Sequence, residues 1–384
     1  MAAGARQQQR RLGLVFSGAG ARAVFQVGAY EVLVQDPRFA GAEFLSCTSG
    51  GSINAAMVAS GKTPAQMMDF WLRFADTPPV HANKAFFREA VVTLAKVSLP
   101  FSSRTRTGAT LGWLFGRLLH HLSPDPGNLL ALGLEILLTR RWDLVDRFLT
   151  QMTESSLLHS GPLRDKIVQG IGGETLPTGR IHIAINTIDV ACSEPVRIVT
   201  QEAARGLRLN DRYLVVPAIT VDHVVASAAL PLLLPPVAYA GRYLIDGGLL
   251  VNSALAPAVD LGADIIVPIL AMAKADARLS QYKNLNEAVE RIAESLFESH
   301  YQSDRKLLLD RNRLSGSAPG SQTRYREVKL YQAIRPPDSS MFDVGSYLYF
   351  SRGLLGEMYE AGKAAAAAWL KQGPLLDSLR PESP

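Results

Sequence analysis

Short apolar runs that end in small residues dominate the first part of the chain. Residues 14–16 are apolar and lead into a glycine-rich turn, after which apolar residues recur at helical spacing over 24–34. A second apolar run over 44–47 passes through another small-residue turn into a helical segment over 53–59. Short apolar runs favour strands, and apolar residues three to four positions apart favour helices. The pattern therefore predicts a strand–helix–strand–helix unit over residues 12–62.

The remainder of the chain continues this alternation. Isoleucines at every second position over 181–185 predict a strand. Further elements are expected as a short helix at 220–229, a buried strand at 264–270, a long helix at 285–313, a strand at 327–334 and a tail helix at 346–371. Alternating strands and helices are typical of an α/β fold, and we expect a three-layer α/β/α sandwich.

Residues 63–160 interrupt the alternation, because they read as mostly helical with breaks at proline-rich and serine-rich turns. We expect this stretch to be an insertion that caps the sheet. The predicted organisation is a disordered N-terminus at 1–11, a single α/β hydrolase domain over 12–375 with the helical cap insertion at about 63–160, and a flexible tail at 376–384.

Ser49 stands at the apex of the second strand-to-helix turn. A serine there projects its hydroxyl from the sheet edge, and the N-terminus of the following helix stabilises negative charge. An acyl-transfer nucleophile needs this geometry. The elbow pattern is Gly-x-Ser-x-Gly, in which Cys47 takes the place of the first glycine and Gly51 supplies the second. Taken alone, the motif also fits a tight strand-to-helix turn that has no catalytic role.

Two further segments favour the catalytic interpretation. The turn at Gly18 and Gly20 lies between a strand and a helix, where backbone N–H groups converge on an anion. Asp246 ends an apolar strand and is followed by Gly247 and Gly248, so its carboxylate has room to point into a cleft. Together with the elbow serine, these segments supply a nucleophile, a base and an oxyanion site.

The three motifs, in this order, resemble those of the patatin-like phospholipase family. The family pattern is a Gly-Gly-Gly-x-Arg/Lys-Gly loop, a Gly-x-Ser-x-Gly elbow and an Asp-Gly-Gly/Ala turn. The chain reads Gly18-Ala19-Gly20-Ala21-Arg22-Ala23, Cys47-Thr48-Ser49-Gly50-Gly51 and Asp246-Gly247-Gly248. The resemblance covers residues 12–62 and 161–270, with a weaker similarity near 341–362. It implies a patatin-like fold and a lipid acyl hydrolase of the phospholipase A type.

The predicted mechanism is a serine–aspartate dyad, in which Asp246 accepts the proton of Ser49 and Ser49 forms an acyl-enzyme. The N–H groups of Gly18, Ala19 and Gly20 are expected to hold the oxyanion. These two predictions require no cofactor, and no His/Cys cluster has the spacing of a metal site.

Arg22 is expected to brace the glycine-rich loop, although a surface salt bridge is the simpler interpretation. Ala19 and Ala23 replace family glycines, as Cys47 does in the elbow. If position 19 requires a positive φ, alanine is strained there. These departures leave open a lipid-binding or regulatory homologue that has kept the fold and lost the catalytic rate.

Two other enzymatic interpretations also fit parts of the sequence. The spacing Gly18-x-Gly20-x-x-Ala23 fits a dinucleotide-binding fingerprint of an oxidoreductase, but the required acidic residue is misplaced, because Glu43 precedes the second apolar run. Ser49, Asp246 and His300 also follow the order of an α/β-hydrolase triad. His300 falls within a predicted helix rather than a loop, and we expect it, like His223, to be structural.

Composition narrows the remaining possibilities. With 384 residues and 47% hydrophobic content, the chain can form a large core. Two cysteines do not indicate a disulfide framework. The N-terminus lacks an apolar signal segment, and no run is long enough to span a bilayer, so we expect a cytoplasmic protein that can associate with membranes peripherally. The sequence makes no prediction of oligomeric state.

Positive charge is concentrated in one segment. Residues 84–121 contain six Lys or Arg and one Glu, a net charge of +5 that equals the formal charge of the whole chain. Aromatic and aliphatic residues at helical spacing accompany these charges, as in helices that bind anionic lipid surfaces. A packed helical cap explains the segment equally well. No nucleic-acid-binding motif accompanies the charge, so we expect lipid ester substrates and no nucleic acid.

Overall fold

The computed structural model describes residues 11–98, 142–177, 179–205, 210–273, 285–316, 326–337, 340–342 and 344–378. Most of the N-terminal segment expected to be disordered, most of the C-terminal tail expected to be flexible, and residues 99–121 of the basic segment lie outside this description. The chain divides into two compact units. One comprises Met1–Val80, Ser160–Pro231 and Pro236–Pro384, and the other comprises His81–His159 and Leu232–Pro235.

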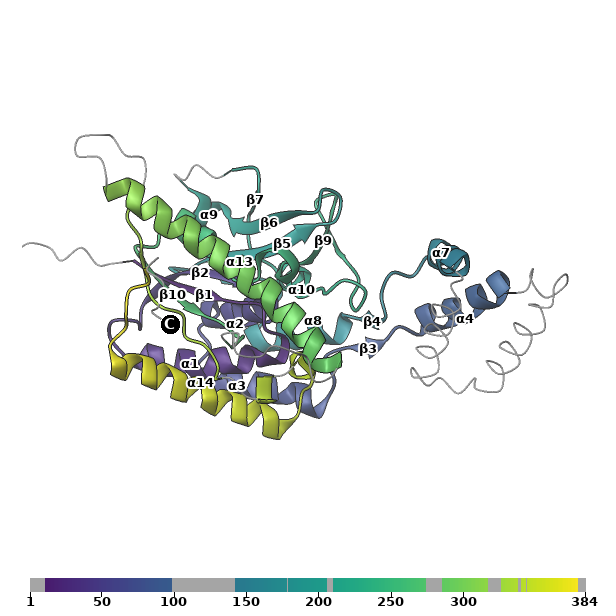
Figure 1. The fold of residues 1–384 in the computed structure, drawn as a ribbon, viewed down its shortest axis with the longest axis horizontal. Coiled ribbons are helices and arrows are strands. Elements are labelled where there is room, and N and C mark those ends of the chain that lie inside the picture. The colour runs from purple at the N-terminus through teal and green to yellow at the C-terminus, as the bar shows by residue number, and fades with distance from the viewer. Residues whose placement is uncertain are drawn as a thin grey trace, which may run out of the picture. The chain divides into compact units, whose positions relative to one another are not determined.

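The first unit is built on a mixed sheet with the strand order β11-β10-β1-β2-β5-β6-β7, to which β9 and β8 are added beside β5 (Figure 1). The strands β11, β10, β1, β2 and β5 run parallel, whereas β6 and β9 are antiparallel to β5. Their bounds are β1 (Leu12–Phe16), β2 (Ala42–Thr48), β5 (His182–Asp189), β6 (Glu194–Thr200), β7 (Tyr213–Val216), β8 (Val237–Tyr239), β9 (Arg242–Asp246), β10 (Ile265–Ile269) and β11 (Lys329–Leu330).

Helices cover both faces of this sheet, which confirms the predicted α/β/α fold. They are η1 (Gly20–Arg22), α1 (Ala23–Gln35), α2 (Gly50–Ala59), α3 (Pro64–Asp76), α8 (Gly161–Ile171), α9 (Gln201–Ala204), α10 (Val221–Ser227), α11 (Gly248–Val251), α12 (Ala256–Leu261), α13 (Leu285–Gly316), η3 (Ser340–Phe342), η4 (Val344–Tyr347) and α14 (Arg352–Gln372).

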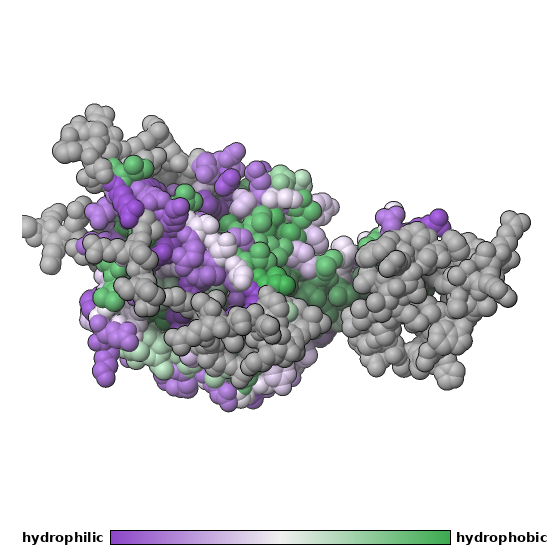
Figure 2. All heavy atoms as spheres, viewed as in Figure 1, coloured by the Kyte–Doolittle hydropathy of each residue, from purple (hydrophilic) through white to green (hydrophobic). Residues whose placement is uncertain are grey.

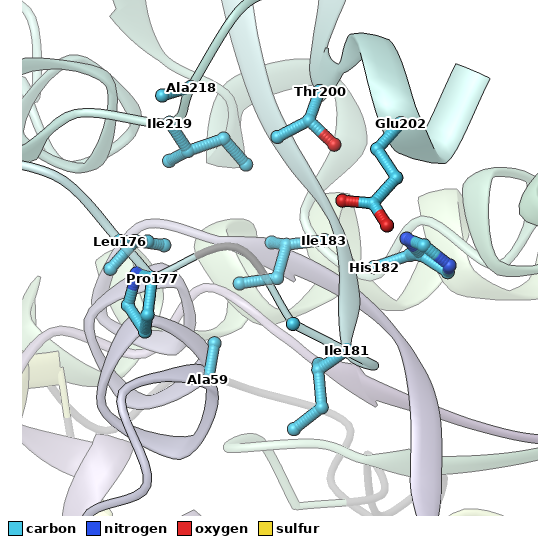
Figure 3. A pocket seen from close by; sticks show the side chains of 11 residues that line it. Ala59, Leu176, Pro177, Ile181, His182, Ile183, Thr200, Glu202, Ala218 and Ile219 are labelled. Atoms are coloured by element: carbon cyan, nitrogen blue, oxygen red, sulfur yellow. The ribbon is translucent and has the colours of Figure 1, made fainter. Parts of the chain in front are cut away.

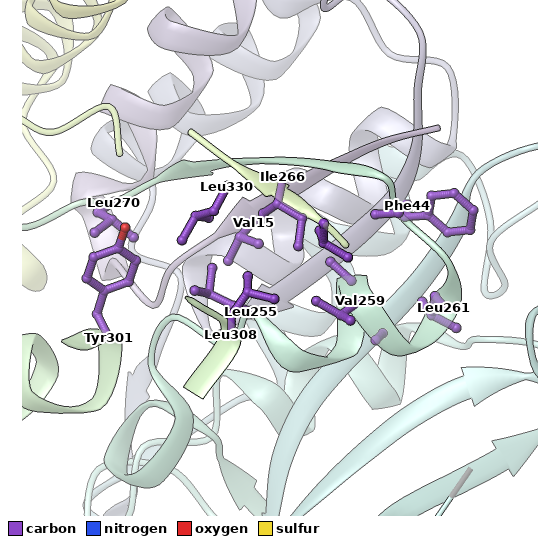
Figure 4. Close-up of a cluster of buried hydrophobic side chains, with 14 of the residues drawn as sticks. Val15, Phe44, Leu255, Val259, Leu261, Ile266, Leu270, Tyr301, Leu308 and Leu330 are labelled. Atoms are coloured by element: carbon purple, nitrogen blue, oxygen red, sulfur yellow. The ribbon is translucent and has the colours of Figure 1, made fainter. Parts of the chain in front are cut away.

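Alternation along the strands assigns side chains to the two faces. Val15 of β1 and Ile266 of β10 belong to a buried cluster that also contains Val259 of α12 and Leu308 of α13 (Figure 4). Phe16 points to the opposite face, where its ring packs against Tyr30 of α1 with 6.2 Å between the ring centroids. β1 therefore contributes apolar side chains to two separate layers.

Glycines allow the two outer helices α1 and α14 to pack closely. A side chain at Gly28 would overlap the Tyr359 carbonyl of α14, and a side chain at Gly362 would overlap the Phe25 carbonyl of α1. The predicted tail helix lies here but begins at Arg352 rather than at 346, because Ser351 caps it by accepting a hydrogen bond from the Leu354 N–H at 3.3 Å.

The strand predicted at 327–334 is shorter in the structure. Only Lys329–Leu330 forms β11, beside β10 at the edge of the sheet. Beyond β11, Tyr331 forms an isolated bridge with Leu376, and Ile334 forms one with Ile269. Because these partners lie in different parts of the chain, the segment does not continue as one β-ladder.

The second unit contains β3 (His81–Ala82) and β4 (Leu158–His159), which pair antiparallel, and the helices α4 (Lys84–Ser98) and α7 (Trp142–Gln151). Asn83 caps α4 by accepting hydrogen bonds from the N–H groups of Ala85 and Phe86 at 3.1 and 3.3 Å. Among the predicted insertion residues, α3 belongs to the first unit. The single-domain organisation and the cap role of the insertion stay predictions.

Candidate active site

Ser49 joins β2 to α2 in a strained backbone conformation, with φ 53° and ψ −127°. Non-glycine residues rarely adopt a positive φ, and such strain is held only where the surrounding structure over-determines it. Gly51 provides part of that restraint, because a Cβ there would lie 2.5 Å from the carbonyl oxygens of Phe16 and Ser17. The elbow thus packs directly on the backbone that follows β1, and the Ser49 side chain stays partly exposed.

The structure brings Ser49 and Asp246 together from positions 197 residues apart. The Ser49 Oγ donates a hydrogen bond to Asp246 Oδ2 at 2.7 Å, and the Gly248 N–H donates to Asp246 Oδ1 at 2.7 Å. Asp246 is placed by β9, where it pairs with Thr187 of β5. Gly247 permits the turn, since a Cβ there would lie 2.5 Å from the Asn186 carbonyl oxygen.

Burial sets the electrostatics of this carboxylate. Asp246 is only 4% exposed. Loss of solvation raises the pKa of Asp246 to about 6, although the hydrogen bonds from Gly248 and Ser49 oppose this rise. A carboxylate with this pKa is ionised at neutral pH and is a better proton acceptor than an ordinary exposed aspartate.

The glycine-rich loop supplies fewer donors than the sequence predicted. The Gly18 N–H already donates to the Asn252 carbonyl oxygen at 2.9 Å, and the Asn252 side chain occupies the place that a Gly18 side chain would need. This donor is therefore taken. The N–H groups of Ala19 and Gly20 make no backbone hydrogen bond to the residues that the structure describes, and they are the candidates for holding an oxyanion.

The three replaced glycines cause no strain. Ala19 has φ −150° and Ala23 has φ −56°, so neither requires a conformation restricted to glycine. The positive φ of the loop falls on Gly20 instead, at 52°. Cys47 fits within β2, where its thiol donates to the Ala184 carbonyl oxygen at 3.4 Å. Burial raises the pKa of this thiol, so it is not a competing nucleophile.

Arg22 is fully buried rather than part of a surface salt bridge. Its Nε donates to Ser346 Oγ at 2.8 Å, and its guanidinium lies 3.9 Å from the centre of the Tyr347 ring. One guanidinium nitrogen lies 3.9 Å from a carboxylate oxygen of Glu294. The partners of Arg22 come from η4 and α13, and its role as a brace of the loop stays a prediction.

Sequence reasoning missed the residues that fix the elbow from below. The Ser49 N–H donates to Ser227 Oγ at 2.9 Å, and Ser227 Oγ in turn donates to the Asn186 carbonyl oxygen at 2.7 Å. The Asn186 side chain donates to the Cys47 carbonyl oxygen at 2.9 Å. The signal in the sequence was a polar residue inside otherwise apolar strand and helix patterns.

A second buried polar network supports the loop. Gln26 of α1 donates to the Ser17 carbonyl oxygen at 2.9 Å, and Asn54 of α2 donates to the Ala23 carbonyl oxygen at 2.8 Å. The Trp71 indole of α3 donates to the Asn54 side chain at 2.9 Å. Buried polar groups that are satisfied in this way rigidify a site.

Neither histidine contacts the dyad among the described residues, where Asp246 receives its hydrogen bonds from Ser49 and Gly248. His223 accepts a hydrogen bond from the Thr220 N–H at 3.0 Å and so caps α10, and burial lowers its pKa to about 4 despite the nearby Asp222. His300 lies inside α13. Burial lowers its pKa as well, opposed by Asp304.

A small pocket lies at the other end of the strands (Figure 3). It is lined by apolar side chains such as Ile183 and Ile219, with His182 and Glu202 among its polar residues. His182 begins β5 and pairs with Phe44, four residues before Thr48 pairs with Asn186 at the elbow end. The pocket is therefore not part of the serine site. No group of three or more His, Cys, Asp and Glu residues in the described ranges could hold a metal ion.

Comparison with known families now adds to this geometry. The sequence model of the Patatin-like phospholipase family matches residues 14–259. The chain belongs to this family. The patatin-like match includes Ser49 and Asp246 and ends within α12, so α13, η4 and α14 lie beyond it. A search of curated proteins finds no match.

Solved structures with low sequence identity also resemble this patatin-like chain. VipD from Legionella pneumophila is 13% identical, with a TM-score of 0.39, over 96% of this chain and 68% of VipD. The type III effector ExoU is 15% identical, with a TM-score of 0.34, over 94% of this chain and 53% of ExoU. The complex ExoU-SpcU from Pseudomonas aeruginosa gives 15% identity and a TM-score of 0.33 over 96% and 53% of the two chains. This chain thus spans about half the length of ExoU.

Proposed function

We propose that this patatin-like protein is a lipid acyl hydrolase in which Ser49 is the nucleophile and Asp246 the general base. Family membership supports lipid ester hydrolysis in general. The observation that carries the finer proposal is the 2.7 Å hydrogen bond from Ser49 Oγ to a buried carboxylate, made from a strained strand-to-helix turn. This combination exposes the hydroxyl and holds its base within proton-transfer distance.

The reaction proceeds in two halves. Asp246 takes the proton of Ser49 Oγ as the oxygen attacks the ester carbonyl carbon. The bond from that carbon to the alcohol oxygen then breaks, and Asp246 returns the proton to the departing alcohol, which leaves an acyl-enzyme on Ser49. In the second half, Asp246 takes a proton from water, hydroxide attacks the acyl carbon, and the proton returns to Ser49 as the fatty acid departs.

The negative charge on the carbonyl oxygen is held by the N–H groups of Ala19 and Gly20. Each donor of this kind lowers the barrier by ~3 kcal/mol. The N-terminus of α2 adds favourable electrostatics, because the helix begins directly after Ser49. Gly18 serves the site differently, since its missing side chain makes room for Asn252 beside Ser49.

A catalytically weakened lipid-binding homologue is the competing proposal. Its support was the three replaced glycines, and the unstrained backbone at Ala19 and Ala23 removes that support. An oxidoreductase is disfavoured, because Glu43 lies near the start of β2 and not at its carboxyl end.

Labelling with a fluorophosphonate tests this proposal. The probe reacts with activated serines, so the wild-type protein is expected to be labelled at Ser49 and Ser49→Ala to remain unlabelled. Hydrolysis of a soluble p-nitrophenyl ester should fall by on the order of 10⁴-fold in Ser49→Ala, with little change in the thermal midpoint. Full labelling of Ser49 without ester turnover would favour the lipid-binding alternative instead.

We further propose that the protein binds anionic membranes through the basic segment at 84–121. The described part of this segment, α4, exposes Lys84, Arg88 and Lys96 together with Val92. In the first unit, Leu249 and Leu250 of α11 are 46% and 40% exposed within four residues of Asp246. Figure 2 shows hydrophobic side chains gathered beside α13 on the face in view. No helix among the described residues is long and apolar enough to cross a membrane.

Vesicle co-sedimentation tests the electrostatic part of this proposal. Replacing Lys84, Arg88 and Lys96 by glutamine should weaken binding to phosphatidylserine-containing vesicles by up to ~1 kcal/mol per charge. High salt should have the same effect on the wild-type protein. The matched control replaces three exposed basic residues of the first unit, Arg180, Lys306 and Lys371. Equal losses in both triple variants would mean that α4 has no special role.

A further inference from the structure

We propose that Glu294, Ser346 and Tyr347, here called the C-terminal clamp, are positioning residues that hold the oxyanion loop through Arg22. The proposal rests on the proposed function, because it explains how the Ala19 and Gly20 donors of that site are kept in place. All three clamp residues lie beyond residue 259, where the family match ends. The clamp therefore lies on segments that the family match does not cover.

The clamp surrounds the Arg22 guanidinium on several sides. Ser346 Oγ accepts from Arg22 Nε at 2.8 Å, the Tyr347 ring lies 3.9 Å below the guanidinium carbon, and Glu294 provides a carboxylate at 3.9 Å. Arg22 itself has no exposed surface. A charge taken fully out of water requires compensating partners, and a cation over an aromatic face is one favourable form of compensation. The position of Arg22 therefore depends on the clamp.

The clamp also touches the loop directly at Gly20. The Tyr347 carbonyl occupies the space where a side chain at position 20 would stand, and Gly20 has φ 52°. On its other side, Gly20 packs against the elbow, since a Cβ at Gly50 would lie 2.7 Å from the Gly20 carbonyl oxygen. Gly20 is thus held between Tyr347 and the residue that follows Ser49, and its N–H direction is fixed by both.

The clamp is anchored to the body of the first unit. The Tyr347 ring packs edge-on against Phe297 of α13, with 6.2 Å between the centroids. Phe342 of η3 packs against Phe25 of α1 at 5.7 Å in the same way. Ser346 is only 7% exposed. Because α1 directly follows the loop, the contact of Phe342 with Phe25 connects the segment that carries Ser346 and Tyr347 to the C-terminal side of the loop.

A misdirected N–H group affects the transition state more than substrate binding, because the oxyanion forms only as the carbonyl is attacked. Loss of the clamp should therefore lower kcat and leave KM nearly unchanged. A purely structural residue would instead lower the thermal midpoint without this separation of the two constants.

The test measures kcat and KM for p-nitrophenyl butyrate in the full chain. Tyr347→Leu is expected to lower kcat by ~10–100-fold, because a single oxyanion donor is worth ~10²–10³, with KM within about twofold. Tyr347→Phe keeps the ring under the guanidinium and should retain most of kcat. Tyr301→Leu is the matched control. Tyr301, which lies on α13, also packs under an arginine, and the Arg335 guanidinium is 5.1 Å from the centre of its ring. This control variant should lower the thermal midpoint but preserve kcat.

Hydrogen exchange of the loop gives a readout that does not depend on activity. Amides of residues 19–23 should exchange at least about tenfold faster in Tyr347→Leu than in Tyr301→Leu, because only the first loses the ring beneath the Arg22 guanidinium. If Tyr347→Leu does not fold, Ser346→Ala removes a single hydrogen bond and should show the same direction of change. Unchanged exchange together with unchanged kcat would overturn the clamp. Faster exchange in Tyr347→Leu, together with a wild-type protein that shows no Ser49-dependent activity, would support the clamp and reject the proposed function.

Discussion

The buried cluster under α12 and α13 and the candidate active site lie on the same strands, yet they are built by opposite means. In the cluster, Val15 and Ile266 fill space with apolar side chains and are fully buried (Figure 4). At the carboxyl ends of these strands and their neighbours, the important residues are glycines, whose missing side chains let Gly18, Gly51 and Gly247 touch backbone or polar groups. The interior is therefore specified by apolar side chains that fill space, and the site by glycines that let backbone and polar groups approach closely.

The two regions also treat polarity differently. The cluster excludes charge, whereas the site buries Asp246 and Arg22, each held by a few hydrogen bonds or ring contacts. Burying a charge lowers the stability of the fold unless the charge is compensated. Buried charged residues such as Asp246 and Arg22 therefore indicate a functional site. Mutations in the site should therefore lower mainly activity, whereas mutations in the buried cluster should lower mainly stability.

The largest expected effect is on activity. Asp246→Asn should lower ester hydrolysis by on the order of 10³–10⁴-fold, because the base is lost while the asparagine can still hydrogen-bond Ser49 and Gly248. The measurement is kcat/KM on a soluble ester at pH 8. His300→Ala is the control and should keep most activity. A loss of several orders of magnitude in His300→Ala would replace the dyad by a triad.

In the buried cluster the expected effect is on stability. Ile266→Ala should lower the free energy of unfolding by about 2–5 kcal/mol, because it leaves a cavity in a site with no exposed surface. Chemical denaturation measures this change. The activity per folded molecule should remain close to that of the wild type, and a large fall in kcat would mean that the interior and the site are not separable.

A smaller loss of stability is expected where backbone contacts replace side-chain packing. Gly51→Ala introduces a Cβ that would lie 2.5 Å from two carbonyl oxygens, and such overpacking costs about 1–3 kcal/mol. Unlike Ile266→Ala, it should also reduce activity, because it displaces the elbow. Gly41→Ala is the matched control, with nothing within 4 Å of the added atom. Equal thermal midpoints for the two variants would contradict this account.

The smallest predicted effect concerns pH. Because the pKa of Asp246 is about 6, kcat/KM for a soluble ester should fall about tenfold per pH unit below pH 6 and reach a plateau above it. A profile that is flat from pH 5 to 8 would rule out Asp246 as the base.

The same raised pKa has a consequence for stability. The folded chain binds the Asp246 proton more tightly than the unfolded chain does, so this stabilisation is complete below pH 3.8 and is lost as the pH rises through about 6. Asp246→Asn should consequently exceed the wild type in stability by at most about 3 kcal/mol above pH 7, and the difference should vanish near pH 4. Thermal midpoints of both proteins across this range measure it.

Much of the fold and the core of the site could be predicted from the sequence. Short apolar runs ending in small residues identified β1, β2 and the turns that follow them, because both strand periodicity and glycine turns are local properties. The same patterns indicated Ser49 and Asp246. Element ends were less accurate, as the later start of α14 shows, since capping by Ser351 decided where the helix began.

Only the tertiary structure decided which groups meet. Ser49 and Asp246 come into contact because β9 pairs with β5 beside β2, a pairing that joins residues 197 positions apart. The Gly18 N–H was removed from the predicted oxyanion donors by the Asn252 carbonyl, and Arg22 received its partners from η4 and α13. The sequence by itself determined local conformation, because this depends on neighbouring residues, and it determined which functional groups are present. Their partners, burial and pKa values depend on long-range packing, which no local pattern encodes.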